Sequence, residues 1–173
     1  VNGDEHYLHY EILTRMIDEN GELAPPDKFI PVAESYNLAD KIDMIIITKT
    51  LNWLKNHPEH VLKLNMCSIN LSGQSLGDPQ FIDDLVDLLI RSSLPLEKLC
   101  FEITETVAIG NFSNASKLIN TLKKLGCQLS LDDFGTGLSS FGYLKRLNVD
   151  YLKIDGVFVK DMAKDEQDFG IVK

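Results

Sequence analysis

Each of four strand-like runs in the sequence has one apolar face and one polar face. Alternate residues of a strand point to opposite sides of a sheet. A doubly wound sheet carries helices on both faces, so both sets of residues would be apolar. A TIM-type barrel explains the pattern, because its apolar set meets the surrounding helices while its polar set faces the interior. The faces therefore predict an α/β fold of the TIM-type (β/α) barrel class. The runs are Val61–Ser72, Lys98–Thr106, Cys127–Phe134 and Val149–Asp155; the apolar set is Ile69, Leu71, Phe101, Ile103, Leu129, Leu131, Leu152 and Ile154, and the polar set includes Ser68, Asn70, Glu102, Ser130, Asp132 and Lys153.

Helical segments separate these runs, and a further strand precedes them at His9–Met16. Alternating strands and helices indicate a parallel sheet. In the first helical segment we expect Asp40 to cap the second half. The residues expected to face the core are Ile42, Ile45, Ile46, Trp53 and Leu54. The chain holds about five of the eight strands of a barrel. The predicted helical segments are Pro26–His57 with a break near Asn37, a helix opening at Asp78-Pro79, Asn114–Gly126, Leu138–Leu147 and a last helix from near Phe158.

Charge and composition exclude several classes of partner. The 173 residues include 17 basic and 26 acidic side chains, a net charge of −9. Such a surface does not attract DNA, RNA or an anionic membrane, so an anionic substrate needs a local cation. The three cysteines fit no zinc pattern and are expected to be buried, reduced thiols of a cytoplasmic protein. No apolar run reaches the length of a transmembrane helix.

Oxygen-bearing side chains lie at or near the ends of four predicted strands: Glu11, Asn70, Glu102 and Asp132. Carboxylate and amide oxygens suit Mg²⁺ or Mn²⁺, whereas the sulfur and imidazole ligands that zinc favours are missing from the set. Asp133 follows directly and is placed to hold a second metal ion that shares Asp132. Two metals about 3.5–4 Å apart clamp the attacking and leaving oxygens of a phosphodiester. The pattern predicts a metal site for phosphodiester chemistry.

The residues next to these acids can be interpreted either as functional or as ordinary structural residues. Lys153 is placed to orient a water molecule or to stabilise developing charge, and the turn Gly135–Gly137 gives the backbone freedom to approach a ligand. Alternatively, two acids before a glycine form a solvated turn, Lys153 pairs with Asp155, and Glu105 supports a loop. The triplet Asp-Phe-Gly also binds metal in kinases, but a kinase needs a Gly-rich loop and an His-Arg-Asp motif that this sequence lacks.

Six motifs occur in order along nearly the whole chain: YEILTR, FIPVAE, INLS, FEITET, LDDFGTGLSSFGYLKRL and DYLKID. Together they resemble the EAL domain family, bacterial phosphodiesterases that hydrolyse cyclic di-GMP. The resemblance implies Mg²⁺ or Mn²⁺ as cofactor, with two ions in the complete domain. It places the metal ligands at Glu11, Asn70, Glu102, Asp132 and Asp133.

The resemblance also implies roles beyond metal binding. Lys153 matches the catalytic lysine of the family, and Arg15 matches an arginine that contacts the substrate. Glu105 matches the glutamate that supports the loop containing Asp132. We also assign Asp133 a catalytic part and expect Asp155 on the substrate side of the site.

The sequence departs from the family pattern in three ways. The Glu-Ala-Leu signature is Glu11-Ile12-Leu13, and Leu138 stands where the family often has tyrosine. The first strand and the last two strands of the barrel are missing, including a strand whose glutamate joins the metal site. Residues 1–173 are therefore expected to be a partial EAL domain that self-associates, with little activity alone. The resemblance implies attachment to sensory or GGDEF domains in the parent chain.

Three functions remain open on the sequence alone. The leading hypothesis is hydrolysis of cyclic di-GMP to linear pGpG by metal-activated water. The main alternative is an inactive EAL domain that senses cyclic di-GMP or binds a protein partner. A metal-dependent barrel acting on another phosphate ester is the third. Every family ligand position within the segment is present, which favours the enzyme.

Overall fold

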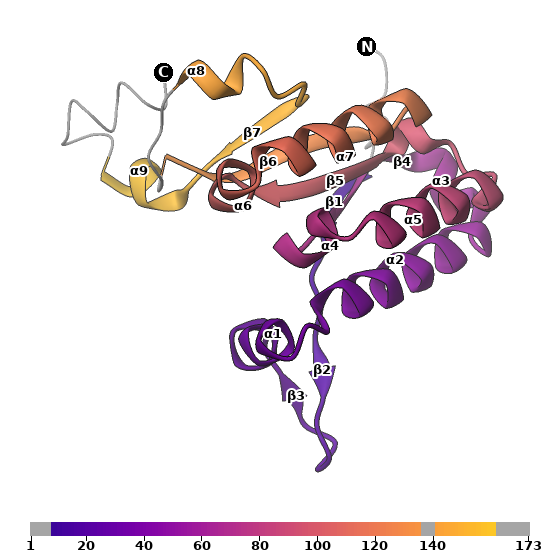
Figure 1. The fold of residues 1–173 in the computed structure, drawn as a ribbon. Helices are drawn as coiled ribbons and strands as arrows, with labels where there is room; N and C mark the ends of the chain where they lie inside the picture. The colour runs from indigo at the N-terminus through magenta and orange to yellow at the C-terminus, as the bar shows by residue number, and fades with distance from the viewer. Residues whose placement is uncertain (1–7, 136–140, 162–173) are drawn as a thin grey trace.

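The computed structural model describes residues 8–135 and 141–161, and within them a parallel five-stranded sheet forms the centre of the fold (Figure 1). Its strands lie in the order β1-β4-β5-β6-β7. The five strands are β1 Leu8–Ile12, β4 Leu64–Asn70, β5 Leu99–Thr104, β6 Gln128–Phe134 and β7 Tyr151–Ile154. All neighbouring pairs are parallel, which confirms the architecture expected from the alternating elements.

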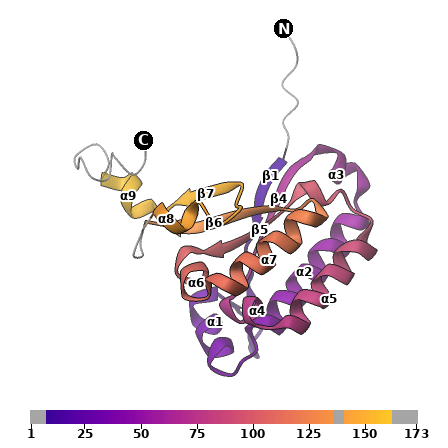
Figure 2. The same cartoon turned by 45° about the horizontal axis from the view of Figure 1, so that its top comes forward.

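Helices connect these strands, and a short antiparallel hairpin follows β1. Figure 1 shows the hairpin and α1 projecting away from the sheet, and Figure 2 shows α2, α5 and α7 side by side along one face of it. No helix in the described part of the chain is long and apolar enough to span a membrane. The remaining elements are β2 Met16–Ile17, β3 Leu23–Ala24, α1 Pro26–Ser35, α2 Ala39–Lys55, α3 Pro58–Lys63, α4 Gly73–Gly77, α5 Pro79–Ser92, the 3₁₀ turn η1 Leu96–Lys98, α6 Glu105–Gly110, α7 Phe112–Leu125, α8 Phe141–Leu144 and α9 Gly156–Asp161.

The two faces of the sheet differ as the sequence predicts. The apolar residues of β4, β5 and β6 are fully buried against the helices, with Ile69, Phe101 and Leu129 each at 0% exposure. The outer strand β7 is the exception, since Leu152 is 46% exposed rather than buried. A strand at the edge of the described sheet has fewer neighbours to cover it. The core therefore lies between the middle strands and helices α2, α5 and α7.

Two helix ends show clear local signals. Asp78 caps α5 by accepting a hydrogen bond from the backbone N–H of Gln80, and Pro79 occupies the first turn. Gly126 ends α7 with a φ of 97°, a left-handed value that glycine adopts without steric cost.

The prediction for α2 was wrong at two points. The helix begins at Ala39, so Asp40 lies inside its first turn and the N-cap residue is Leu38. Ile45 and Trp53 are 54% and 46% exposed, because the buried stripe of the helix runs through other positions, including Ile47 and Leu51. Leu54 is buried as expected. Consecutive apolar residues left the buried face of this helix undefined in the sequence.

The sheet is curled, so that side chains of its two outer strands meet. Glu11 of β1 and Lys153 of β7 form an ion pair with 3.1 Å between Oε2 and Nζ, although three strands separate them in the sheet. Such curvature is that of a barrel wall. Several strand boundaries differ from expectation. β1 ends at Ile12 instead of continuing to Met16, which belongs to the β2–β3 hairpin. The expected strand Val61–Ser72 begins only at Leu64, because residues 61–63 belong to α3, and the expected strand Lys98–Thr106 ends at Thr104, where α6 follows.

Candidate active site

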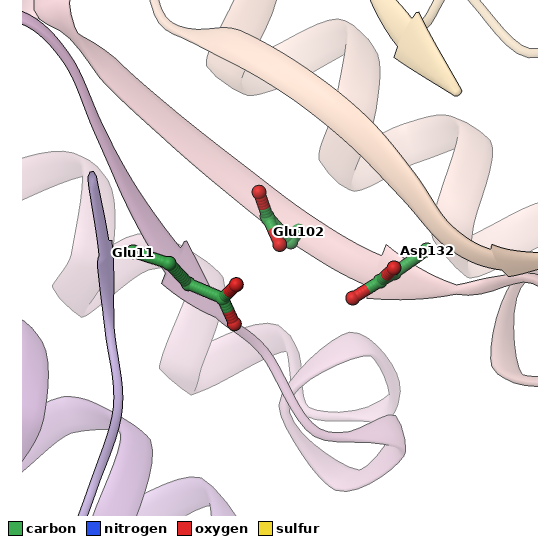
Figure 3. Close-up of side chains that lie close together, drawn as sticks. All are labelled: Glu11, Glu102 and Asp132. Atoms are coloured by element: carbon green, nitrogen blue, oxygen red, sulfur yellow. The ribbon is translucent and has the colours of Figure 1, made fainter. Parts of the chain in front are cut away.

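Three carboxylates converge around one ammonium group on the inner face of the curled sheet. Lys153 Nζ donates hydrogen bonds to Glu102 Oε2 at 2.6 Å, Asp132 Oδ2 at 3.0 Å and Glu11 Oε2 at 3.1 Å. The acids come from β1, β5 and β6, and Figure 3 shows them converging on one region. Lys153 therefore pairs with these three acids. The alternative prediction from the sequence, an ion pair between Lys153 and Asp155, is wrong.

The position of each acid follows from its strand. Glu102 lies on β5 in the middle of the sheet and is only 3% exposed. Asn70 of β4 is the register partner of Glu102, and its amide Nδ2 donates to Glu11 Oε1 at 2.7 Å. Asn70 thus holds the Glu11 carboxylate beside the group.

A bulge at the end of β6 accommodates the adjacent acids. Leu131 pairs with Leu152 and Phe134 with Ile154, so β6 advances three residues while β7 advances two. The extra residue lets Leu131 and Phe134 both lie in the core, at 0% and 4% exposure, with the two acids between them. Asp133 has a φ of 54°, a left-handed conformation that aspartate adopts more readily than most residues. Strict alternation would have placed one acid in the apolar layer.

The second acid, Asp133, lies outside the three-carboxylate group. It is exposed, and the carboxylate atoms that lie within 4.8 Å of one another belong to Glu11, Glu102 and Asp132 only, among the residues described. Desolvation, reinforced by the nearby charges of Asp132 and Asp155, raises the pKa of the Asp133 carboxyl. Asp155 lies at the end of β7, where its Oδ1 accepts from the Val157 N–H at 2.7 Å at the start of α9.

Behind Asp133, a buried glutamate holds the chain in place. Glu105 is 0% exposed, and its Oε2 accepts a hydrogen bond from the Gly135 N–H at 2.9 Å. Its Oε1 accepts from the Tyr143 hydroxyl of α8. Gly135 has a φ of 102°, and a Cβ there would lie 2.6 Å from the Phe158 ring of α9. Glu105 therefore joins the end of β6 to α8, as a loop support would. Thr136, Gly137 and Leu138 lie outside the described residues.

The substrate arginine expected from the sequence lies apart from the carboxylate group. Arg15 is exposed on the link between β1 and β2, where its Nη1 donates to the Thr14 carbonyl at 2.7 Å. It lines a mainly apolar cavity of about 340 Å³ beside α2, together with Lys49. The structure therefore does not bring Arg15 into contact with Lys153 or its acids.

The donor set fits a divalent cation. Its ligand atoms are oxygens that lie within 4.8 Å of one another, a chemistry that suits Mg²⁺ or Mn²⁺. Three carboxylates and one ammonium leave a formal charge of −2, which one divalent cation balances. Burial alone lowers the pKa of Lys153, but hydrogen bonds to Glu102, Asp132 and Glu11 outweigh burial and raise the pKa above its ordinary value. Lys153 thus remains a cation rather than a proton acceptor.

The protein-family model for the EAL domain matches residues 2–173 of this chain. The chain belongs to the EAL domain family. Cyclic di-GMP phosphodiesterase PdeB of Shewanella oneidensis is 40% identical over 94% of this chain and 19% of its own length. Cyclic di-GMP phosphodiesterase PdeF of Escherichia coli is 37% identical over 99% of this chain and 23% of its own length. The chain thus spans about a fifth of these curated relatives.

Solved EAL structures share the fold. The FimX EAL domain from Pseudomonas aeruginosa bound to c-di-GMP superposes with a TM-score of 0.85 at 34% identity, over 98% of this chain and 67% of that one. PaMucR phosphodiesterase in a c-di-GMP complex gives a TM-score of 0.82 at 31% identity, over 94% of this chain and 66% of that one. These matches and the curled parallel sheet of five strands in the described residues establish the TIM-type barrel fold of EAL domains.

Two parts of this EAL site were not predicted from the sequence. The sequence predicts only a short helix around Tyr143, whereas in the structure its hydroxyl donates to Glu105 Oε1. A tyrosine that follows a glycine turn by a few residues gives no signal of this contact. The bulge at Asp133 also went unpredicted, and a signal existed: strict alternation conflicts with the apolar Phe134 after two acids.

Proposed function

We propose that the protein carrying this EAL segment hydrolyses cyclic di-GMP to linear pGpG in a metal-dependent reaction. The observation that carries the proposal is the convergence of Glu11, Glu102 and Asp132 around Lys153 on one barrel face. The family match and the names of PdeB and PdeF support the same substrate and reaction.

In this proposal Glu11, Glu102 and Asp132 hold Mg²⁺ or Mn²⁺, with Asn70 and Asp133 completing a site for two ions. When bound, the metal activates a water molecule and neutralises charge on the phosphate. Asn70 already orients Glu11 through its amide hydrogen bond.

The remaining residues act on the substrate and on the loop. Lys153 supplies a fixed positive charge that stabilises the phosphate as negative charge develops there. Glu105 keeps the end of β6, and with it Asp133, in position through the Gly135 N–H. Arg15 and Asp155 are assigned to substrate binding. Because Arg15 lies apart from the carboxylates, it would contact a part of the nucleotide away from the scissile phosphate.

We extend the proposal to the assembly. In this proposal residues 1–173 form a partial EAL domain without the first strand and the last two strands of the family's barrel. Among the described residues, β1 and β7 are the outer strands of the sheet. Outer strands carry unpaired backbone groups that recruit further strands or a second copy, so the isolated segment should self-associate. In the parent protein we expect a cytoplasmic location and attached sensory or GGDEF domains.

The test is to incubate the full-length protein with cyclic di-GMP and Mn²⁺ or Mg²⁺ and to separate the products by chromatography. Linear pGpG that forms only with metal supports the proposal. Glu102→Gln should abolish product, whereas Asp87→Asn, on the exposed face of α5, should leave the rate unchanged. Cyclic di-GMP that binds but stays intact would refute hydrolysis and indicate a sensor. The FimX EAL domain bound to c-di-GMP is the observation that favours this second candidate.

A further inference from the structure

One buried hydroxyl group on the inner face of the barrel has no hydrogen-bond partner in the described part of the chain. Ser130 of β6 is 1% exposed, and its Oγ atom makes no hydrogen bond. The large majority of buried polar side-chain atoms have a partner, whether protein or ordered water. Ser68 also lies on this inner face, so what calls for an explanation is that the Ser130 hydroxyl has no partner.

The position of Ser130 ties it to the active site. In the β5–β6 ladder its register partner is Glu102, and on β6 it lies two residues before Asp132. Its register partner on the other side is Tyr151, two residues before Lys153 on β7. Ser130 is therefore the direct neighbour of Glu102 in the sheet, two residues before the level of Lys153 on β7. The Glu102–Lys153 ion pair has 2.6 Å between its atoms.

A cavity adjoins Ser130. Its volume is about 360 Å³, and its lining includes Ser130, Glu102, Lys153 and Ser68. A buried water molecule needs a polar site with two to four hydrogen-bonding partners and far less volume than this. The Glu102 carboxylate provides an acceptor, because an ionised carboxylate has about four lone-pair sites and Lys153 occupies one.

We propose that Ser130 is a positioning residue for the active site. Its hydroxyl donates to a water molecule held in this cavity, and the water donates to the Glu102 carboxylate. The water holds the carboxylate on the side of Ser130, while Lys153 contacts it on the side of Glu11 and Asp132. Ser130 thereby sets the orientation of an acid that is otherwise hydrogen-bonded only to Lys153 among the described residues. The catalytic consequence rests on the proposed hydrolysis, whereas the water site does not.

The test compares Ser130→Ala with Ser130→Thr in the full-length protein. Loss of a residue that orients a metal ligand lowers activity by about tenfold or more. Ser130→Ala should therefore show a kcat about tenfold lower at unchanged KM, and Ser130→Thr, which keeps the hydroxyl, should restore most of it. Ser116→Ala on α7, a half-buried serine outside the site, is the matched control and should keep wild-type kcat. A purely structural role would change the melting temperature without this pattern.

A crystal structure of the wild-type protein gives a readout that does not depend on activity. Electron density for a water within hydrogen-bond distance of both Ser130 Oγ and Glu102 supports the proposal. A dry cavity, or wild-type kcat in Ser130→Ala, would overturn it. Absence of any hydrolysis by the wild type would instead contradict the proposed function, and the water site would then be decided by the crystal structure alone.

Discussion

Removing the ammonium group of Lys153 should destabilise the protein and increase its response to metal. Lys153→Met keeps most of the apolar stem but leaves three carboxylates with no cation between them. Exposed ion pairs contribute about 0.2–1 kcal/mol, and breaking a buried pair costs about 3–5 kcal/mol. The Glu102 side chain is 3% exposed and the Lys153 side chain is 37% exposed. The pair is therefore intermediate between an exposed and a buried ion pair. We expect a loss of about 2 kcal/mol in the free energy of unfolding.

Thermal unfolding without and with Mn²⁺ measures both effects. For a protein of this size, about 2 kcal/mol corresponds to a decrease in Tm of about 4–8 °C. The formal charge of the group changes from −2 to −3, so Mn²⁺ should bind the variant more tightly and raise its Tm by more than it raises that of the wild type. Calorimetry with and without the metal gives both numbers.

The matched control is Lys123→Met, which breaks a partly exposed ion pair with Asp150 away from the site. It should cost less than about 1 kcal/mol and leave the metal response as in the wild type. If Lys153→Met melted at the wild-type temperature and gained no more from Mn²⁺, the three contacts of Lys153 would not stabilise the acids. The argument for a cation-binding group would then be wrong.

Three further predictions concern separate parts of the molecule. Asp132→Asn should remove Mn²⁺ binding and activity while the Tm changes little, measured by titration calorimetry and product assay; wild-type turnover would make Asp132 a plain turn residue. Burial raises the pKa of the Cys67 thiol to about 11 and those of the other two cysteines to about 12, so a thiol reagent at pH 8 should label none until denaturant is added. Gly135→Ala should lower the Tm, because the new methyl group meets the Phe158 ring and the φ of 102° disfavours alanine. Gly135→Ala with Phe158→Leu should recover part of that loss, and no recovery would show that the backbone angle alone causes it.

The sequence predicts the fold well because burial acts on every second residue of a strand. Leu129 and Leu131 face the helices and Asp132 the interior, as alternation requires. The faces of α2 were harder to predict, since the run of apolar residues from Met44 to Ile47 offers several equivalent stripes. Tertiary packing determines which stripe is buried, and the local sequence does not indicate it.

The candidate site also has a part that the sequence predicts and a part that it does not. Glu11, Glu102 and Asp132 could be grouped from the sequence because the ends of parallel strands meet at one end of a barrel. The lysine was expected nearby, but its contact with all three acids depends on how far the sheet curls. Curvature is a property of the assembled sheet, so a single strand does not encode it.

The bulge at Asp133 also has an evolutionary consequence. Because Asp133 is the additional residue, a one-codon deletion there would restore strict alternation and leave Leu131, Asp132 and Phe134 on the faces they occupy now. We expect such a deletion variant to keep its far-UV circular dichroism spectrum, with the carboxylate group around Lys153 intact. A lineage could thus gain or lose the second acid in a single step, without rearranging the core that supports the first.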